Sequence, residues 1–110
     1  MTTGPIDIMQ GTVDVLVLRA LAWGPMHGYA VSRWIRDRTN GTIDVEDAPL
    51  YKSLHRLEQD GSAAATWGLS DNNRRARYYT LTPAGRQRLK AELTSWRRYT
   101  DAVSLALAPE

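Results

Sequence analysis

The chain is 110 residues long, which suffices for one compact domain but not for two. Its 43% hydrophobic and 24% charged residues are typical of globular proteins, and the absence of cysteine excludes disulfides and thiolate metal sites. No run of about 18 apolar residues is present, so we expect no membrane-spanning helix. The first residues lack a basic stretch followed by an apolar one, so we expect no secretory signal and a cytoplasmic protein.

The net charge of +2 conceals an uneven distribution along the chain. Residues 1–51 carry 4 basic and 6 acidic side chains, whereas residues 52–98 carry 10 basic and 4 acidic ones. Twelve of the 14 basic residues are arginines, whose planar guanidinium can donate two parallel hydrogen bonds to a phosphate or a guanine. A basic segment often only solvates a surface, so the distribution suggests a nucleic-acid partner without establishing one.

Two helices are predicted in the first part of the chain, after a loose arm over residues 1–8. Apolar residues at helical spacing predict a strongly apolar core helix over residues 9–23. A second helix is predicted over residues 27–39, with its apolar stripe facing inward. Residues 42–45 are expected to form at most a short strand or an extended link.

A third helix is predicted over residues 48–60. Asp47 is suited to cap its first N–H groups, Pro49 to occupy its first turn, and Gly61 to take the left-handed conformation that ends it. One stripe of this helix is apolar and consists of Leu50, Leu54 and Leu57. The opposite side is polar, with an aromatic flank, and consists of Lys52, His55, Arg56, Gln59 and Tyr51. Such side chains can donate to phosphates or base edges, although an ordinary amphipathic surface helix has the same pattern.

A β-hairpin is predicted next, with strands over residues 62–69 and 76–81 and a polar turn over residues 70–75. The alanine-rich start of the first strand has poor strand propensity. Three arginines cluster at and just after the hairpin tip, namely Arg74, Arg75 and Arg77. Helix, turn, helix, link, helix and hairpin is the order of a winged helix-turn-helix fold, which is mainly α with a small β-hairpin wing.

A last helix is predicted over residues 83–107, with Thr82 as N-cap and Pro83 at its first position. An apolar stripe follows it and contains Leu89, Leu93, Trp96, Tyr99 and Val103. A helix of about 37 Å is too long to be covered by the core of so small a domain. We therefore expect residues 1–82 to form the DNA-binding domain and residues 83–110 a dimerisation helix. The alternative is that the stripe packs back on the first helix of the same chain. We expect part of the stripe to contact both that helix and a second subunit.

The sequence gives little support for catalysis. Its two histidines, His27 and His55, lie far apart and have no metal-ligand partner three or four residues away. His27 is better suited to hydrogen-bond at the start of a helix than to bind a metal. No phosphate-binding glycine loop or nucleophile elbow is present. We therefore expect no enzyme, no metal and no cofactor.

Five stretches of the sequence have a recognisable family pattern, and they cover residues 18–29, 50–51, 54–58, 67–68 and 72–85. The most specific signal is the tyrosine pair that is followed by Leu81-Thr82-Pro83-Ala84-Gly85. On these stretches the chain resembles the PadR family of bacterial transcriptional regulators, over residues 10–107 and in the short form with a single C-terminal helix.

The resemblance implies a winged helix-turn-helix homodimer, usually a repressor, that a small molecule or another signal releases from its DNA operator. It implies that one group of residues faces the operator from the helix and the wing: Tyr51, Lys52, His55, Arg56, Arg74, Arg75 and Arg77. Pro49 and Lys52 depart from the usual family residues. They motivate the alternative of a winged-helix module that binds mainly a protein partner or a small molecule, with little DNA binding.

The resemblance also bears on Trp96, on the stripe of the last helix. In multidrug-responsive relatives an aromatic residue at the dimer interface stacks flat, apolar ligands. The stripe Leu89, Leu93, Trp96, Tyr99 and Val103 is therefore a candidate dimer interface or pocket for a small apolar or aromatic effector. Plain packing of Trp96 between two subunits explains the same pattern.

Overall fold

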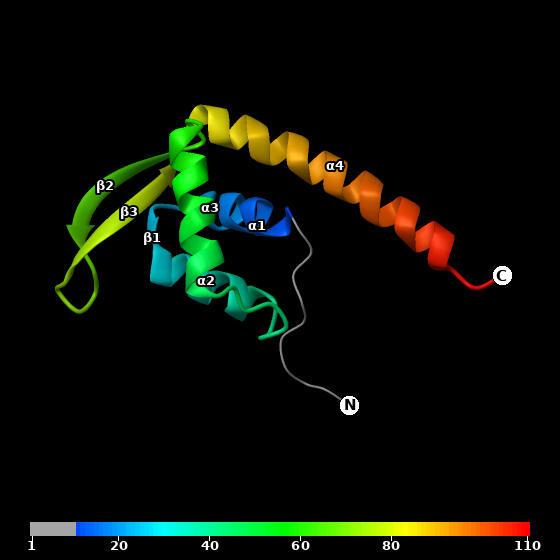
Figure 1. Ribbon diagram of the computed structural model, residues 1–110, viewed down its shortest axis with the longest axis horizontal. Coiled ribbons are helices and arrows are strands. Elements are labelled where there is room, and N and C mark those ends of the chain that lie inside the picture. The colour runs from blue at the N-terminus through cyan, green and yellow to red at the C-terminus, as the bar shows by residue number, and fades with distance from the viewer. Residues whose placement is uncertain (1–10) are drawn as a thin grey trace.

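The structure, a computed structural model, describes residues 11–110, so the arm expected for residues 1–8 lies outside the described residues. Three helices form the body, a hairpin projects from one side, and a long helix leaves from the other (Figure 1). The elements are α1 (Thr12–Leu21), β1 (Met26–His27), α2 (Gly28–Arg38), α3 (Asp47–Gln59), β2 (Ala63–Leu69), β3 (Arg75–Leu81) and α4 (Pro83–Leu107). This arrangement confirms the predicted winged helix-turn-helix fold.

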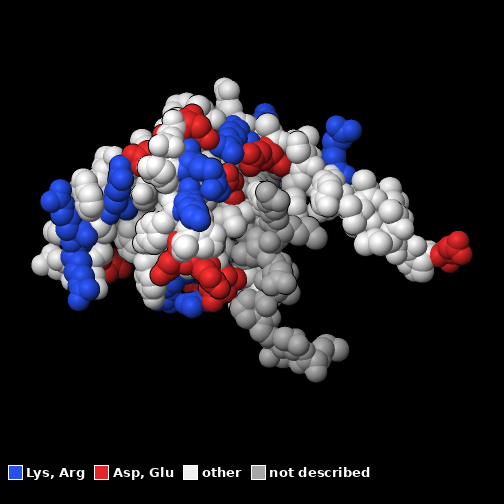
Figure 2. Space-filling model, viewed as in Figure 1, with Lys and Arg blue, Asp and Glu red and all other residues white. Residues whose placement is uncertain are grey.

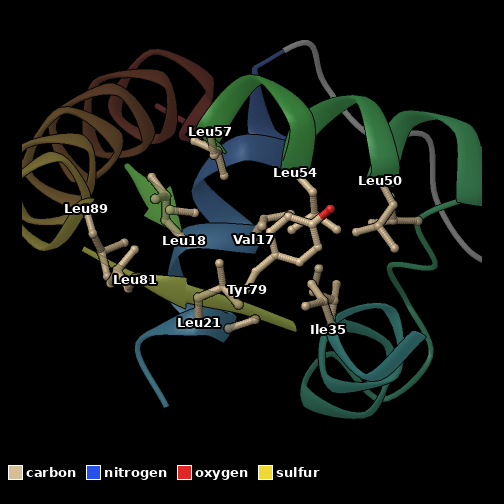
Figure 3. Packing of buried hydrophobic residues seen from close by; sticks show 14 residues of the cluster. Val17, Leu18, Leu21, Ile35, Leu50, Leu54, Leu57, Tyr79, Leu81 and Leu89 are labelled. Atoms are coloured by element: carbon tan, nitrogen blue, oxygen red, sulfur yellow. The ribbon is translucent and has the colours of Figure 1, made fainter. Parts of the chain in front are cut away.

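One apolar core joins the three short helices to the base of the sheet (Figure 3). The predicted inner stripe of α3 is confirmed, since Leu50, Leu54 and Leu57 are fully buried. They pack in the same cluster as Val17 of α1 and Tyr79 of β3. Burial of a leucine side chain contributes about 1.5–3 kcal/mol, so this stripe holds α3 firmly and leaves its opposite side for solvent or a partner.

The first two helices differ from the predictions only at their ends. α1 begins at Thr12, after Gly11 with φ of +87°, and ends at Leu21 rather than at residue 23. α2 follows His27, whose Nδ1 accepts a hydrogen bond from the Ala30 N–H at 3.2 Å. The expectation that His27 hydrogen-bonds at a helix start is thereby confirmed.

The start of α3 corrects a prediction. Asp47 is its first helical residue, while Glu46 occupies the N-cap position and makes no capping hydrogen bond through its side chain. Asp47 therefore contributes through its charge near the positive end of the helix rather than as a cap. At the other end Gly61 has φ of +82°, as the predicted termination requires.

The sheet has three antiparallel strands in the order β1-β3-β2. Ala63 pairs with Leu81 and Leu69 with Arg75, so the predicted hairpin is confirmed, including its alanine-rich first strand. The third strand, β1, was not predicted from the sequence, and its residues Met26 and His27 pair with β3. Residues 42–45, where a short strand or an extended link was expected, form no strand.

α4 begins and ends where the sequence predicts. The Thr82 hydroxyl accepts a hydrogen bond from the Gly85 N–H at 3.0 Å, and Pro83 occupies the first turn. Leu89 is buried in the core and Leu93 is half-buried against it. The far part of α4 extends away from the body (Figure 1). From Trp96 onward the large apolar side chains of this helix are exposed.

Candidate nucleic-acid interface

The outer side of α3 presents the polar residues that the sequence placed there. Tyr51, Lys52, His55 and Arg56 are all exposed, and their spacing follows from the burial of the leucine stripe behind them. Basic side chains gather over α3 and over the hairpin on the face that Figure 2 shows. The fold thus brings the helix and wing residues to neighbouring positions on one surface.

Arg56 is exposed but already paired. Its guanidinium donates to the Asp14 carboxylate of α1 at 2.7 Å, and its side chain is 55% exposed. The buried Ser53 hydroxyl donates to the same Asp14 oxygen at 2.5 Å. Sequence reasoning missed this pairing, because Asp14 is 42 residues away and stands in the apolar pattern of α1.

The hairpin tip is ordered by its own hydrogen bonds. The Ser70 N–H donates to the Arg74 carbonyl at 2.8 Å, and the Ser70 hydroxyl lies 2.6 Å from the Asn72 side-chain oxygen. Asn73 adopts the left-handed conformation with φ of +60°, which asparagine tolerates better than most residues. The tip therefore holds Arg74 in a defined turn.

The three wing arginines have different environments. Arg75 stacks over the ring of Trp67 with its guanidinium carbon 4.6 Å from the ring centroid. Arg77 donates to the Glu58 carboxylate of α3 at 2.5 Å and lies over Tyr79. Arg74 makes no ion pair among residues 11–110. Arg74 and Arg75 are therefore the wing cations whose charge is not matched by a carboxylate.

An open groove of about 1080 Å³ lies between α2, the start of α3 and the wing. Five aromatic and four cationic side chains line it, together with Asp37 and Asp71: Tyr29, Trp34, Tyr51, Trp67, Tyr79, Arg33, Arg74, Arg75 and Arg77. Tyr29, Arg33 and Trp67 were not among the predicted contact residues. Tyr29 is 62% exposed and Trp67 is 60% exposed.

Gly28 leaves the space that Tyr51 occupies in this groove. A Cβ atom at Gly28 would lie 2.7 Å from the Tyr51 ring and hydroxyl, so only glycine permits this close approach. Tyr51 is half exposed, with its outer part in the groove. The first residue of α2 thereby permits the observed placement of an aromatic side chain near the start of α3.

A second candidate surface lies on α4. Trp96, Tyr99 and Val103 are 39%, 55% and 37% exposed, and the rings of Trp96 and Tyr99 are 6.1 Å apart. Trp96 and Tyr99 line a hollow of about 420 Å³ against the start of α1. Leu89, in contrast, is 6% exposed and belongs to the core of its own subunit, which removes it from the candidate surface.

No helix among residues 11–110 has the length and apolar character needed to cross a membrane. Within the same residues, no group of three or more His, Cys, Asp or Glu side chains is arranged to hold a metal ion.

The three-helix body, the paired wing and the exposed face of α3 define a winged helix-turn-helix protein with one additional long helix. The chain belongs to the PadR-like family of transcriptional regulators, whose family model matches residues 17–91.

Solved structures share this fold over most of the chain. A transcriptional regulator from Clostridium thermocellum is 27% identical, with a TM-score of 0.84 over 94% of this chain and 100% of that one. A PadR family regulator from Eggerthella lenta DSM 2243 is 30% identical, with a TM-score of 0.77 over 92% and 86% of the two chains. Bacillus subtilis PadR, solved in complex with operator DNA, is 21% identical, with a TM-score of 0.66 over 74% and 46%.

Proposed function

We propose that the protein is a sequence-specific DNA-binding repressor that acts as a homodimer in the cytoplasm. The observation that carries the proposal is the exposed polar face of α3 beside a wing whose Arg74 and Arg75 have no carboxylate partner among the described residues. Membership of a regulator family supports it, as does the operator complex of a relative with the same fold. In this proposal α3 is the recognition helix and lies in the major groove of DNA.

The environments of the cations divide their roles. Lys52 has no ion pair within residues 11–110, so its ammonium is available to a base edge or a phosphate. Arg74 and Arg75 contact phosphates or the minor groove from the wing. Arg56 and Arg77 must exchange or share their carboxylate partners before they contact DNA, so they contribute less to affinity. Tyr51 and His55 complete the contact surface on α3.

The exposed stripe on α4 supports the homodimer. Trp96, Tyr99 and Val103 lie on the part of the helix that leaves the body, and the apolar Leu107 at its end is 78% exposed. Two copies of α4 related by a two-fold axis would cover both stripes. Recognition of two half-sites one turn of DNA apart would require the two α3 helices of the dimer to lie about 34 Å apart.

A flat effector could bind beside Trp96 and Tyr99 once a second subunit closes their hollow. The test is titration of the dimer with a planar aromatic probe while Trp96→Leu is compared with wild type. A pocket predicts loss of probe binding in a variant that remains dimeric. If Trp96→Leu dissociates into monomers and the wild-type dimer binds no probe, Trp96 serves only to pack the two subunits together.

DNA binding is tested with the DNA upstream of the protein's own gene, by fluorescence anisotropy across a salt series. Because each phosphate contact releases counterions, the logarithm of affinity should fall linearly with the logarithm of salt concentration. Replacing Arg74 and Arg75 together by Ala should lower affinity for all sequences and reduce the slope by roughly 2 for each subunit, or roughly 4 for the dimer. Lys52→Ala should change sequence preference instead.

Arg98→Ala is the matched control, because Arg98 is exposed on α4 and makes no ion pair within residues 11–110. It should leave the affinity and the salt slope nearly unchanged. Affinity that is independent of salt, or wing and control variants that behave alike, would contradict the proposal. Absence of measurable DNA binding would favour the protein-binding or small-molecule-binding alternative.

A further inference from the structure

Arg88, one turn into α4, binds three carboxylates from three parts of the fold. Its guanidinium donates to Asp60 at 2.5 Å and to Glu92 at 2.9 Å, and lies 3.6 Å from Asp14. Glu92 is in α4 itself, Asp60 is the C-cap of α3, and Asp14 is in α1. Arg88 thus connects the proposed dimerisation helix directly to the end of the proposed recognition helix.

The contact with Asp14 extends the connection to the middle of α3. The same carboxylate accepts the hydrogen bonds of Ser53 and Arg56, and Ser53 is fully buried between the helices. Hydrogen bonds that involve charged groups are directional and stronger than neutral ones. The network therefore adds a directional constraint on the angle between α4 and α3 to the apolar packing of Leu89 and Leu93.

The charges in this network stabilise one another. Burial alone would lower the pKa of Arg88, but the hydrogen bond and charge of Glu92, with Asp60 and Asp14, raise it above its usual value. Burial alone would raise the pKa of Asp60, but hydrogen bonds from Ser62 and the charge of Arg88 hold it below its usual value. Both groups are therefore charged near neutral pH, and the connection persists there.

The start of α4 supplies a fixed point for this constraint. The Thr82 hydroxyl donates to the Gly61 carbonyl at 2.6 Å, and the Thr82 N–H donates to the Ser62 carbonyl at 3.1 Å. Gly85 lies so close to the Ser62 carbonyl that a Cβ atom there would be 2.0 Å from the oxygen. One end of α4 is thus anchored beside the α3–β2 turn, and Arg88 holds its direction from there.

A small change of that direction has a large effect at the far end of α4. The helix continues from Arg88 to Leu107, about 28 Å at 1.5 Å per residue, so a tilt of about 10° moves its end by about 5 Å. Neighbouring base pairs are separated by about 3.4 Å and rotated by about 34°. A tilt of this size is therefore comparable with a shift of one to two base pairs between two half-sites.

We propose that Arg88 is a positioning residue that sets the half-site spacing accepted by the dimer, by fixing the angle between α4 and α3. This inference rests on the proposed function, because it requires a DNA-binding dimer joined through α4. Arg88 makes no contact with DNA in this proposal. Its loss should broaden spacing preference while each half-site is still recognised.

The experiment uses the full chain and a half-site obtained by selection from random DNA with the wild-type protein. Palindromic duplexes with half-site centres 8–13 base pairs apart are compared with a duplex that contains a single half-site. A rigid dimer loses its avidity when both half-sites cannot be engaged, so wild type should bind the best spacing at least about tenfold more tightly than its neighbours. Arg88→Gln should reduce that ratio to below about threefold and leave single half-site affinity within about twofold.

Two further variants make the test specific. Arg86→Gln removes the same charge two residues earlier, at an exposed position without an ion pair among the described residues, and should keep the sharp optimum. Asp60→Asn removes one carboxylate partner of Arg88 but keeps an oxygen that can accept the hydrogen bond of the Ser62 N–H, and should broaden the preference partially. Asp60→Asn also serves if Arg88→Gln fails to fold.

Each outcome decides the inference. A spacing optimum as sharp in Arg88→Gln and Asp60→Asn as in wild type overturns it. A loss of affinity for the single half-site as large as the loss for the palindromic duplexes also overturns it, because that result indicates a purely structural role. A wild type that binds DNA without any spacing preference overturns it while leaving the proposed function intact. A wild type that binds no DNA overturns the proposed function and the inference together.

Discussion

Replacing Gly85 by Ala tests how closely α4 is joined to the wing domain. Helix propensity alone predicts stabilisation, because Ala is more favourable than Gly inside a helix by about 1 kcal/mol. The structure predicts the opposite. A Cβ atom at position 85 would lie 2.0 Å from the Ser62 carbonyl oxygen and 2.7 Å from the Leu81 side chain. Carbon–oxygen contacts are normally about 3.3 Å or longer, so α4 would have to move by more than about 1 Å.

The shift would displace the Thr82 hydrogen bonds to Gly61 and Ser62 as well. Overpacking of this kind usually costs about 1–3 kcal/mol, and the rigid partner here is backbone rather than the end of a flexible side chain. The expected decrease in Tm is roughly 4–8 °C for each kcal/mol in a domain of about this size.

The assay is thermal unfolding followed by circular dichroism at one fixed protomer concentration, because association makes Tm depend on concentration. The neighbouring exposed substitution Ala84→Gly measures the contribution of helix propensity without a clash. A Gly85→Ala protein as stable as wild type, or more stable, would refute the close approach of α4 to the α3–β2 turn.

Three other results are expected. Gly28→Ala should change stability little, because the Tyr51 ring that it would contact is half exposed and can move. The displaced ring should weaken DNA binding in anisotropy measurements, and unchanged affinity would exclude a role for the placement of Tyr51. Burial raises the pKa of Tyr79 above its usual 10.0, so the folded state keeps a proton that the unfolded state releases, and stability falls as pH rises above 10. Tyr79→Phe should flatten that decrease in urea unfolding between pH 9 and 11, and an equally steep decrease would contradict this assignment. Val103→Glu should place a charge in the proposed α4 interface and give monomers in sedimentation, with little loss of Tm when compared at dilute concentration; a dimer that persists would move the interface elsewhere.

Long periodic elements of this fold were predictable from the sequence, and short or tertiary features were not. The leucine stripe of α3 and the Thr82-Pro83 start of α4 gave correct helices, since burial and capping act over a few residues. β1 has only two residues, which is too short for any periodicity to be visible. The alanine-rich start of β2 has poor intrinsic strand propensity, and its pairing with β3 and the burial of Ala63 override that propensity.

The candidate site was predicted as a set of exposed residues but not as a network. The sequence identified the outer side of α3 and the arginines of the wing, and the structure places both on neighbouring surfaces. The sequence could not reveal that Asp14 pairs with Arg56 or that Glu58 pairs with Arg77, because those pairs join residues 42 and 19 positions apart. The three carboxylate contacts of Arg88 were hidden for the same reason.

A dimer that holds two α3 helices against one face of DNA is tested most directly by measuring stoichiometry on the DNA upstream of the protein's own gene. Sedimentation of the protein with a duplex that contains one selected palindrome should give two chains per duplex, with affinity that falls steeply as salt rises. One chain per duplex, or a complex whose affinity does not depend on salt, would contradict the proposed arrangement.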